Sequence, residues 1–245
     1  MNVKWEFEIN PFARSWWDSF VDSHYDGDVI ITVDQEDHGR FYGISSIHFD
    51  ELDDATEVWQ RAYALKSMFD ACMYLTHDDF KPFSLGELHH QQKKYYPAPE
   101  RNVFAEPYSP NLCLDKYKNS EKPLENSVSR WLYTARFDPL SKNLLLMLGT
   151  QGLTYVSLYS ALDYMKTAGW DDNKLVSTGK ITKADIKLFT HTANTPSAAG
   201  PLARHGEKNW TPPSSPMLLT DAIPLFCRLI GTFLNIRTAT YASVS

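Results

Sequence analysis

The stretch DELDDATEVWQRAYALKSMFDACMYLT, residues 50–76, carries the clearest helical pattern in the chain. Its apolar residues recur at spacings of three and four, the period of one buried helix face; they are Ala55, Val58, Trp59, Ala62, Leu65, Phe69 and Met73. Carboxylates crowd the first turn, where they favour the positive end of a helix, and Asp50 is the expected N-cap. The acidic cluster at 50–54 also has the oxygen ligands of a hard cation, but a helix start is sufficient to explain it.

Two patterns typical of β-strands precede this helix. Apolar and polar residues alternate in 4–10, which predicts a half-buried strand whose inward residues are Trp5, Phe7 and Ile9. The segments 28–34 (DVIITVD) and 40–49 (RFYGISSIHF) follow, joined through the polar turn residues 37–39, so we predict a hairpin. A small sheet covered by the helix at 50–76 makes an α+β N-terminal part, residues 1–80.

Residues 81–123 show neither period and include the proline- and aromatic-rich stretch YYPAPERNVFAEPYSPN at 95–111. We predict an ordered but irregular connection between the N-terminal part and a C-terminal part, residues 124–245. Exposed rings in series promote aggregation, so four aromatic side chains are expected to be partly buried: Tyr95, Tyr96, Phe104 and Tyr108.

The C-terminal part predicts a mostly α-helical bundle. Pro139 is expected to open one helix, Gly169 to follow the end of another, and Pro224 to be tolerated only in a first turn. The expected helices cover 124–137, 139–149, 154–169, 183–192 and 221–236, with a Pro/Ser/Gly-rich loop at 194–216. The predicted fold class is therefore α+β: a small N-terminal β-sheet or hairpin with one long helix, then a mostly α-helical C-terminal bundle.

Charge is distributed unevenly along the chain. Residues 1–80 contain 17 Asp and Glu against 5 Lys and Arg, whereas residues 81–245 contain 13 acidic and 19 basic side chains. Such a division suggests that the two parts face different partners, or one another. It argues against nucleic acid on the acidic part, where a protein partner is expected, and leaves RNA open as a partner of the basic part.

Several features predict a cytoplasmic protein. The N-terminus MNVKWEFEIN is charged and alternating, unlike a signal peptide. The apolar stretches 143–162 and 222–236 are interrupted by polar residues, glycine or arginine, and predict core helices rather than membrane spans. Cys72, Cys113 and Cys227 are odd in number and far apart, which indicates reduced thiols.

Most familiar catalytic motifs are missing from the sequence. It contains no phosphate-binding P-loop, no dinucleotide-binding glycine motif, no HExxH and no GxSxG, and we expect no cofactor. The eight histidines have no metal-ligand spacing. His89 and His90 are adjacent, so on a helix they would point about 100° apart and could not chelate one ion. We therefore expect no metal site.

One loop, HTANTPSAAGPLARHG at 191–206, concentrates groups that can act on a phosphate. Arg204 can hold a phosphate through two hydrogen bonds, and His205 can move a proton near neutral pH. Metal-independent RNA cleavage requires such a base and such a cation. The surrounding residues 174–210 contain six Lys and Arg against two Asp and Glu. We expect Arg204 to bind nucleic acid together with Lys180, Lys183 and Lys187. The alternative is a structural loop in which Arg204 and His205 cap neighbouring helices.

The helical C-terminal half, about residues 124–240, resembles the bacterial all-helical domains called HEPN through its ARHG loop at 203–206, which lies between two expected helices. HEPN domains are common in defence and toxin systems, are typically dimeric, and many cleave RNA with an Arg and a His at the dimer cleft. The resemblance implies self-association and catalytic roles for Arg204 and His205. The family separates its Arg and His by several residues, whereas these two are adjacent.

Three functions remain open from the sequence. The first is a binding or assembly protein, dimeric through its helical part, in a bacterial defence or toxin-type system. The second is a metal-independent endoribonuclease that uses Arg204 and His205. The third is a small-molecule sensor or an unrelated enzyme. An RNA-cleavage assay in EDTA would separate the first two, and a ligand that stays bound through purification would favour the third.

Overall fold

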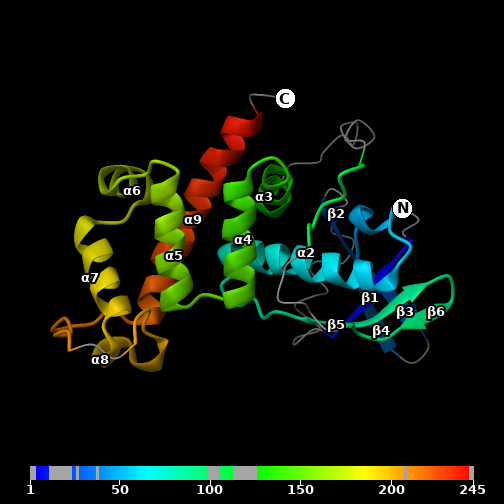
Figure 1. Cartoon of the computed structure of the whole chain (residues 1–245), viewed down its shortest axis with the longest axis horizontal. Coiled ribbons are helices and arrows are strands. Elements are labelled where there is room, and N and C mark those ends of the chain that lie inside the picture. The colour runs from blue at the N-terminus through cyan, green and yellow to red at the C-terminus, as the bar shows by residue number, and fades with distance from the viewer. Residues whose placement is uncertain are drawn as a thin grey trace. The chain divides into compact units, whose positions relative to one another are not determined.

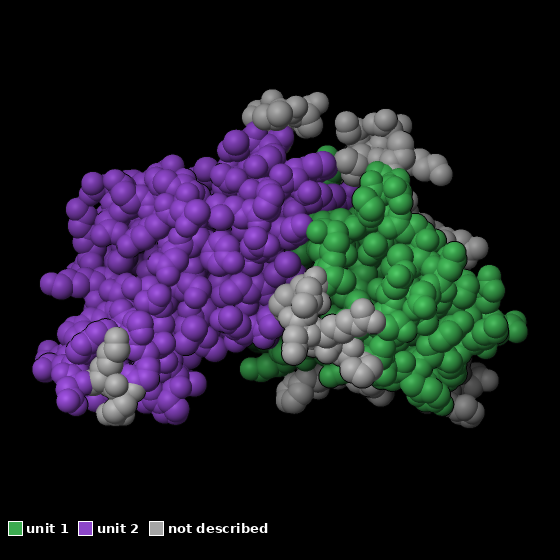
Figure 2. Space-filling view, in the orientation of Figure 1, with its two compact units in different colours: residues 1–70, 79–133 green, residues 71–78, 134–245 purple. Residues whose placement is uncertain are grey.

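The computed structural model describes residues 4–10, 24–25, 28–36, 39–98, 105–112, 126–206 and 209–242. The chain divides into two compact units (Figure 2). The first, which we call the sheet unit, comprises residues 1–70 and 79–133, and the second, the helical unit, comprises 71–78 and 134–245. The predicted fold class is confirmed, because a small antiparallel sheet with one long helix is followed by a mostly helical part.

Six strands within the described residues form one antiparallel sheet in the order β2-β3-β4-β1-β5-β6 (Figure 1). They are β1 (Glu6–Asn10), β2 (His24–Tyr25), β3 (Val29–Glu36), β4 (Gly39–Ser45), β5 (Ser84–His90) and β6 (Lys93–Tyr95). The strand predicted at 4–10 is β1, which lies inside the sheet between β4 and β5. The predicted hairpin is β3–β4, with Glu36 opposite Gly39; turn residues 37–38 lie outside the described residues.

The two faces of β1 have opposite characters. Trp5, Phe7 and Ile9 are each at most 2% exposed, as the alternation predicts. The Phe7 ring packs edge-on against Trp59 of helix α2 (Ala55–Thr76), with centroids 4.7 Å apart. Burial of this apolar face removes it from water and stabilises the layer of sheet and helix. Glu6 and Glu8 therefore lie on the other face, where they are partly exposed.

Helix α2 begins at Ala55, five residues after Asp50, which the sequence predicted as its N-cap. Asp54, not Asp50, is the capping residue, because its carboxylate accepts hydrogen bonds from the backbone N–H groups of Thr56 (2.6 Å) and Glu57 (3.2 Å). Asp50 instead ends the short 3₁₀ helix η2 (Ile47–Phe49), and its N–H bonds to the Ile47 carbonyl. The predicted apolar face is confirmed downstream of Ala55, where its members are buried: Val58, Trp59, Ala62, Leu65, Phe69 and Met73.

The prediction of an irregular connection at 81–123 is wrong for β5 and β6. A two-residue turn joins these strands, and Gln91 and Gln92 there have φ angles of 47° and 64°. Such turns usually carry Asn or Gly, which tolerate positive φ, so a Gln-Gln pair provides no hairpin signal. Because β5 pairs with β1, this segment belongs to the sheet unit and is not a linker.

The aromatic side chains of this segment differ in exposure. Tyr108 is 6% exposed and its hydroxyl donates to the Leu132 carbonyl at 2.7 Å. Tyr95 is half-buried against Trp5. Tyr96 is 78% exposed, so the expectation of burial is wrong there, and Phe104 lies outside the described residues.

The described helices that follow are α3 (Ser127–Ala135), α4 (Pro139–Gln151), α5 (Tyr155–Thr167), α6 (Asp172–Gly179), α7 (Lys183–Asn194), α8 (Pro196–Ala199), η4 (Gly200–Leu202) and α9 (Leu219–Ala242). Pro139 opens α4 and Gly169 follows α5 with φ 79°, as predicted. Helix α6 was not predicted because it is short and mostly polar. Pro224 is the sixth residue of α9 and therefore lies beyond its first turn. The helix is already formed before it, since the Leu218 carbonyl accepts hydrogen bonds from the N–H groups of Asp221 and Ala222.

Helix α9 supplies much of the core of the helical unit. Phe226 packs against Phe189 of α7 with centroids 4.1 Å apart, and Phe233 packs against Trp170 at 5.2 Å. Among the described residues, the segment Leu219–Tyr241 has the length and mean hydropathy, 1.3, that would also allow a helix to cross a membrane. Core helices meet the same criterion, and both of its phenylalanines named here are fully buried.

Two cysteines fall within the described residues. Cys72 is buried and Cys227 is half-buried. Burial, with a smaller contribution from the Asp78 charge, raises the pKa of the Cys227 thiol to about 12. The thiol therefore stays protonated and unreactive at neutral pH. Cys113 lies outside the described residues.

Candidate anion-binding site

The loop predicted to act on phosphate folds back onto the end of α7. The Arg204 backbone N–H donates to the Ala193 carbonyl at 2.7 Å, close to where α7 ends. The last carbonyls of a helix lack partners within the helix, so this bond satisfies one of them. The backbone of Arg204 therefore caps the end of α7, as the structural alternative expected. The side chain of Arg204 takes no part in this cap and can make other contacts.

Helix α5 positions the Arg204 side chain. The guanidinium carbon lies 4.1 Å from the centre of the Tyr159 ring, and Nη2 lies 3.8 Å from Asp163 Oδ2. Tyr159 and Asp163 are one turn apart on α5, so they face the loop together. The stacked ring orients the guanidinium, while the long ion pair and the 34% exposure of the side chain leave donors for a ligand. Neither residue was predicted from the sequence, although their spacing of four places them on one helix face.

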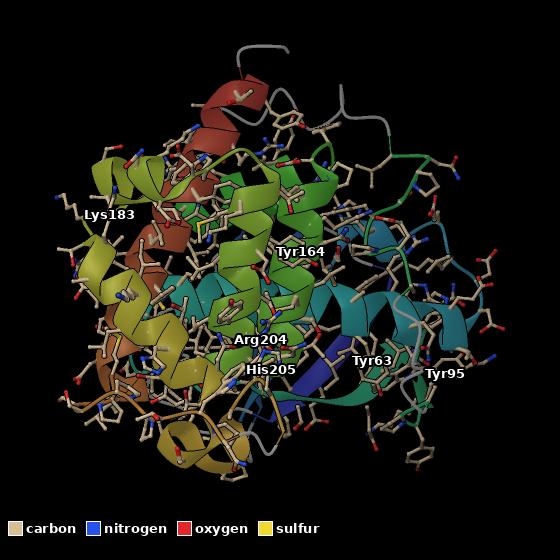
Figure 3. The ribbon with its side chains drawn as sticks, turned by 60° about the vertical axis from the view of Figure 1, so that its left-hand side comes forward. Tyr63, Tyr95, Tyr164, Lys183, Arg204 and His205 are labelled. Atoms are coloured by element: carbon tan, nitrogen blue, oxygen red, sulfur yellow. The ribbon has the colours of Figure 1, made fainter. Side chains whose placement is uncertain are left out.

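His205 lies beside Arg204 (Figure 3). Its Nε2 is 3.4 Å from Arg204 Nη1, and its ring meets Trp210 edge-on at 5.6 Å. A guanidinium only donates hydrogen bonds, so the imidazole nitrogen that faces it is the acceptor in this contact. That nitrogen has a single lone pair, so it can act as a general base toward a ligand hydroxyl only once the long contact with Arg204 is broken.

A cavity of about 430 Å³ opens at this loop. Arg204 and His205 line it, together with Pro196, Ser197, Gly200 and Gly206. This volume falls within the range of small-ligand sites, and the lining combines one cation, one imidazole and one hydroxyl. The arrangement can bind a phosphate-sized anion and its attached group.

The predicted lysines do not line this cavity. Lys183 begins α7, whereas Arg204 contacts the end of that helix, ten residues or about 15 Å away along its axis (Figure 3). Lys183, Lys187 and His191 are exposed and spaced by four, so they form one stripe along α7 toward the loop. Lys180, also exposed, follows α6 in the left-handed conformation.

No protein-family model, curated protein or solved structure matches the chain. A function for this chain is therefore inferred from the geometry of this loop and from the charges around it.

Proposed function

We propose that this protein is a binding protein whose helical unit holds single-stranded RNA at the Arg204 cavity. One observation carries the proposal: the Arg204 guanidinium is oriented on the Tyr159 ring while it faces an open cavity. An arginine held in this way has already lost side-chain freedom, so less entropy is lost when it binds a phosphate.

Two neighbouring features suit a nucleic acid better than a lone phosphate. The Trp210 side chain is 43% exposed and can stack on a base, an interaction that any base can make. Within the stripe, Lys183 and Lys187 offer positive charge along α7 for further phosphates. Lys180 adds a third exposed lysine just before this helix.

We retain self-association in the proposal, but through a different surface of the helical unit. The apolar faces of α4, α5 and α9, which a dimer through the helical part would be expected to use, are largely buried inside the helical unit. Leu202 in the loop at 191–206 and Leu218 just before α9 are 52% and 61% exposed and offer a second copy an apolar surface. The defence or toxin setting follows from the HEPN resemblance alone, and the cytoplasmic location from the sequence alone; both belong to the proposal.

A second candidate is metal-independent RNA cleavage. The position of His205 Nε2, 3.4 Å from Arg204 Nη1, favours it, because an imidazole and a cation then lie together at the cavity. His205 would take the proton of a ribose 2′-hydroxyl, and Arg204 would stabilise the charge that develops on the phosphate.

The test measures binding of a fluorescent single-stranded RNA by anisotropy in EDTA. Arg204→Ala should weaken binding about tenfold, which is about 1.4 kcal/mol, and reduce the salt dependence by about one phosphate contact. Arg228→Ala, at an exposed arginine of α9, is the matched control. Equal binding by wild type and Arg204→Ala would remove the proposal.

The same samples, resolved on a denaturing gel, test the second candidate. Cleavage by the wild type that His205→Ala abolishes, without loss of RNA binding, would establish the endoribonuclease. Intact RNA after prolonged incubation at neutral pH, under conditions where the RNA is bound, would leave binding as the function.

A further inference from the structure

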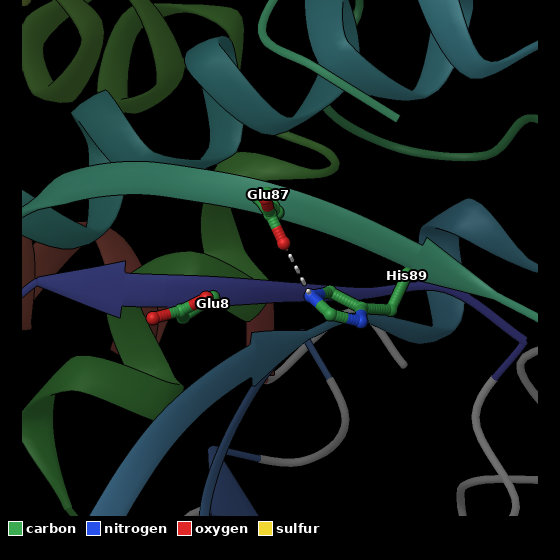
Figure 4. Close-up of side chains that lie close together, drawn as sticks. All are labelled: Glu8, Glu87 and His89. Carbon is green, nitrogen blue, oxygen red and sulfur yellow. Dashed lines mark ion pairs between the residues drawn. The ribbon is translucent and has the colours of Figure 1, made fainter. Parts of the chain in front are cut away.

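The outer face of the sheet brings together three side chains of the kind that hold metal ions. Ligand atoms of Glu8, Glu87 and His89 all lie within 4.8 Å of one another (Figure 4). Glu87 Oε2 and His89 Nε2 are 3.8 Å apart. We propose that these residues bind one Zn²⁺ ion, a site in the sheet unit that goes beyond the proposed function.

An irregularity in the β1–β5 pairing creates this cluster. Phe7 pairs with Leu88 and Ile9 with Leu85, so Gly86 and Glu87 together oppose the single residue Glu8. An extra residue of this kind bends the strand and redirects its side chains. Glu87 and His89 are two residues apart and share one face of β5, so both approach Glu8. No metal site was predicted from the sequence, because Glu8 and His89 lie far apart along the chain and only the pairing of β1 with β5 brings them together.

The cluster adjoins space for the remaining ligands of an ion. A cavity of about 400 Å³ over the sheet is lined by Glu8, His89, Glu6, Lys94 and Gly43. A Cβ atom at Gly43 would lie 2.3 Å from Glu6 Oε1, so glycine makes room for the Glu6 carboxylate beside the cavity. Three protein ligands with room for water are the donor arrangement of an open zinc site.

The charges of the site suit a cation. Within the described residues, the Glu8 carboxylate accepts no hydrogen bond, although it lines the cavity. Lys94 Nζ donates a hydrogen bond to Glu87 Oε2 at 2.7 Å, so a positive charge already lies against this carboxylate. The Lys94 side chain is 59% exposed and flexible. Its ammonium group can therefore move into solvent when an ion binds beside Glu87.

The donor set selects among metals. One imidazole nitrogen with two carboxylates suits Zn²⁺, whereas Mg²⁺ and Ca²⁺ prefer oxygen ligands throughout. Zinc bonds of about 2.0–2.2 Å place tetrahedral ligand atoms about 3.4 Å apart, so ligand atoms now up to 4.8 Å apart would close by as much as about 1.4 Å, which rotation of partly exposed side chains allows.

The experiment is calorimetric titration of the full chain with ZnCl₂, with Co²⁺ absorption as an independent readout of ligand geometry. We expect one ion per chain, with affinity at least about tenfold lower in His89→Ala and in Glu8→Gln. His77→Ala is the control for a histidine elsewhere. Lys94→Met should raise the affinity, because it removes the competing ammonium group while leaving all three ligands.

Three outcomes would overturn the assignment. Zinc binding that survives both His89→Ala and Glu8→Gln would place the ion elsewhere. An unchanged or lower affinity in a folded Lys94→Met would contradict the displacement of the lysine. Absence of binding in both the wild type and Lys94→Met would remove the site altogether.

Discussion

Arg237 on α9 holds Asp138, the N-cap residue of α4, through two hydrogen bonds: Nε to Oδ2 at 2.7 Å and Nη2 to Oδ1 at 2.6 Å. Asp138 is 1% exposed, and its Oδ2 also accepts from the Ser141 hydroxyl. Burial alone would raise the pKa of Asp138, but the bonds from Arg237 and Ser141 outweigh it and hold that pKa below its ordinary value. The pair therefore stabilises the helical unit at neutral pH, and this contribution is lost as the pH falls below about 4.

We predict that Arg237→Ala destabilises the helical unit by about 2–4 kcal/mol, because it leaves a buried carboxylate without its counter-charge. Urea unfolding monitored by circular dichroism measures the effect. Arg228→Ala on the same helix is exposed and should change stability by about 0.5 kcal/mol or less. Equal effects of the two substitutions would show that the pair contributes little.

The contribution of Asp70 to stability should change with pH in the opposite direction to that of Asp138. The residue is 2% exposed, and burial raises its pKa from 3.8 to about 6 despite the Lys66 ammonium 2.5 Å away. The folded state therefore binds a proton at Asp70 more tightly than the unfolded state does. When the pH falls from about 7.5 to 5, the free energy of unfolding of the wild type should rise by about 1.4 kcal/mol relative to that of Asp70→Asn. Melting temperatures of both proteins at the two pH values test it. Asp78→Asn, at an exposed position, should show no such divergence.

Gly179 of α6 lies against Leu229 of α9. A Cβ atom there would lie 2.1 Å from Leu229 Cδ1, and Leu229 is fully buried. Gly179→Ala should therefore cost about 1–3 kcal/mol through overpacking. In the double variant with Leu229→Ala, the added methyl group should fill part of the new cavity, so the two losses should not add. Gly206→Ala, where a Cβ meets nothing within 4 Å, is the control. Strict additivity would contradict the contact.

Arg204→Ala should leave stability almost unchanged, with a loss of about 1 kcal/mol or less, because its ion pair is long and its side chain partly exposed. The backbone bond to Ala193 survives this substitution. Thermal unfolding beside the RNA-binding assay separates the two roles of the loop. A loss of more than about 2 kcal/mol without any effect on RNA binding would make Arg204 a structural residue.

The candidate site could be predicted only in part. Arg204 and His205 are adjacent in sequence, and their chemistry is evident from residue type alone. Tyr159 and Asp163 come from another helix, and no pattern in the loop indicates which helix it folds against. Lys183 shows the converse: proximity in sequence suggested one patch, but the straight rise of α7 carries it away from the cavity.

Periodicity and local capping chemistry by themselves determined several elements of this chain, although not β5, β6 or α6. The alternation around Phe7 gives a strand with one buried face, Pro139 opens α4, and Gly169 ends α5, because each of these effects acts within one or two turns of the backbone. Only the tertiary structure decided that Glu8 meets His89 and that Asp138 meets Arg237. Those contacts depend on strand register and helix packing, which sum many weak interactions between residues far apart in the sequence.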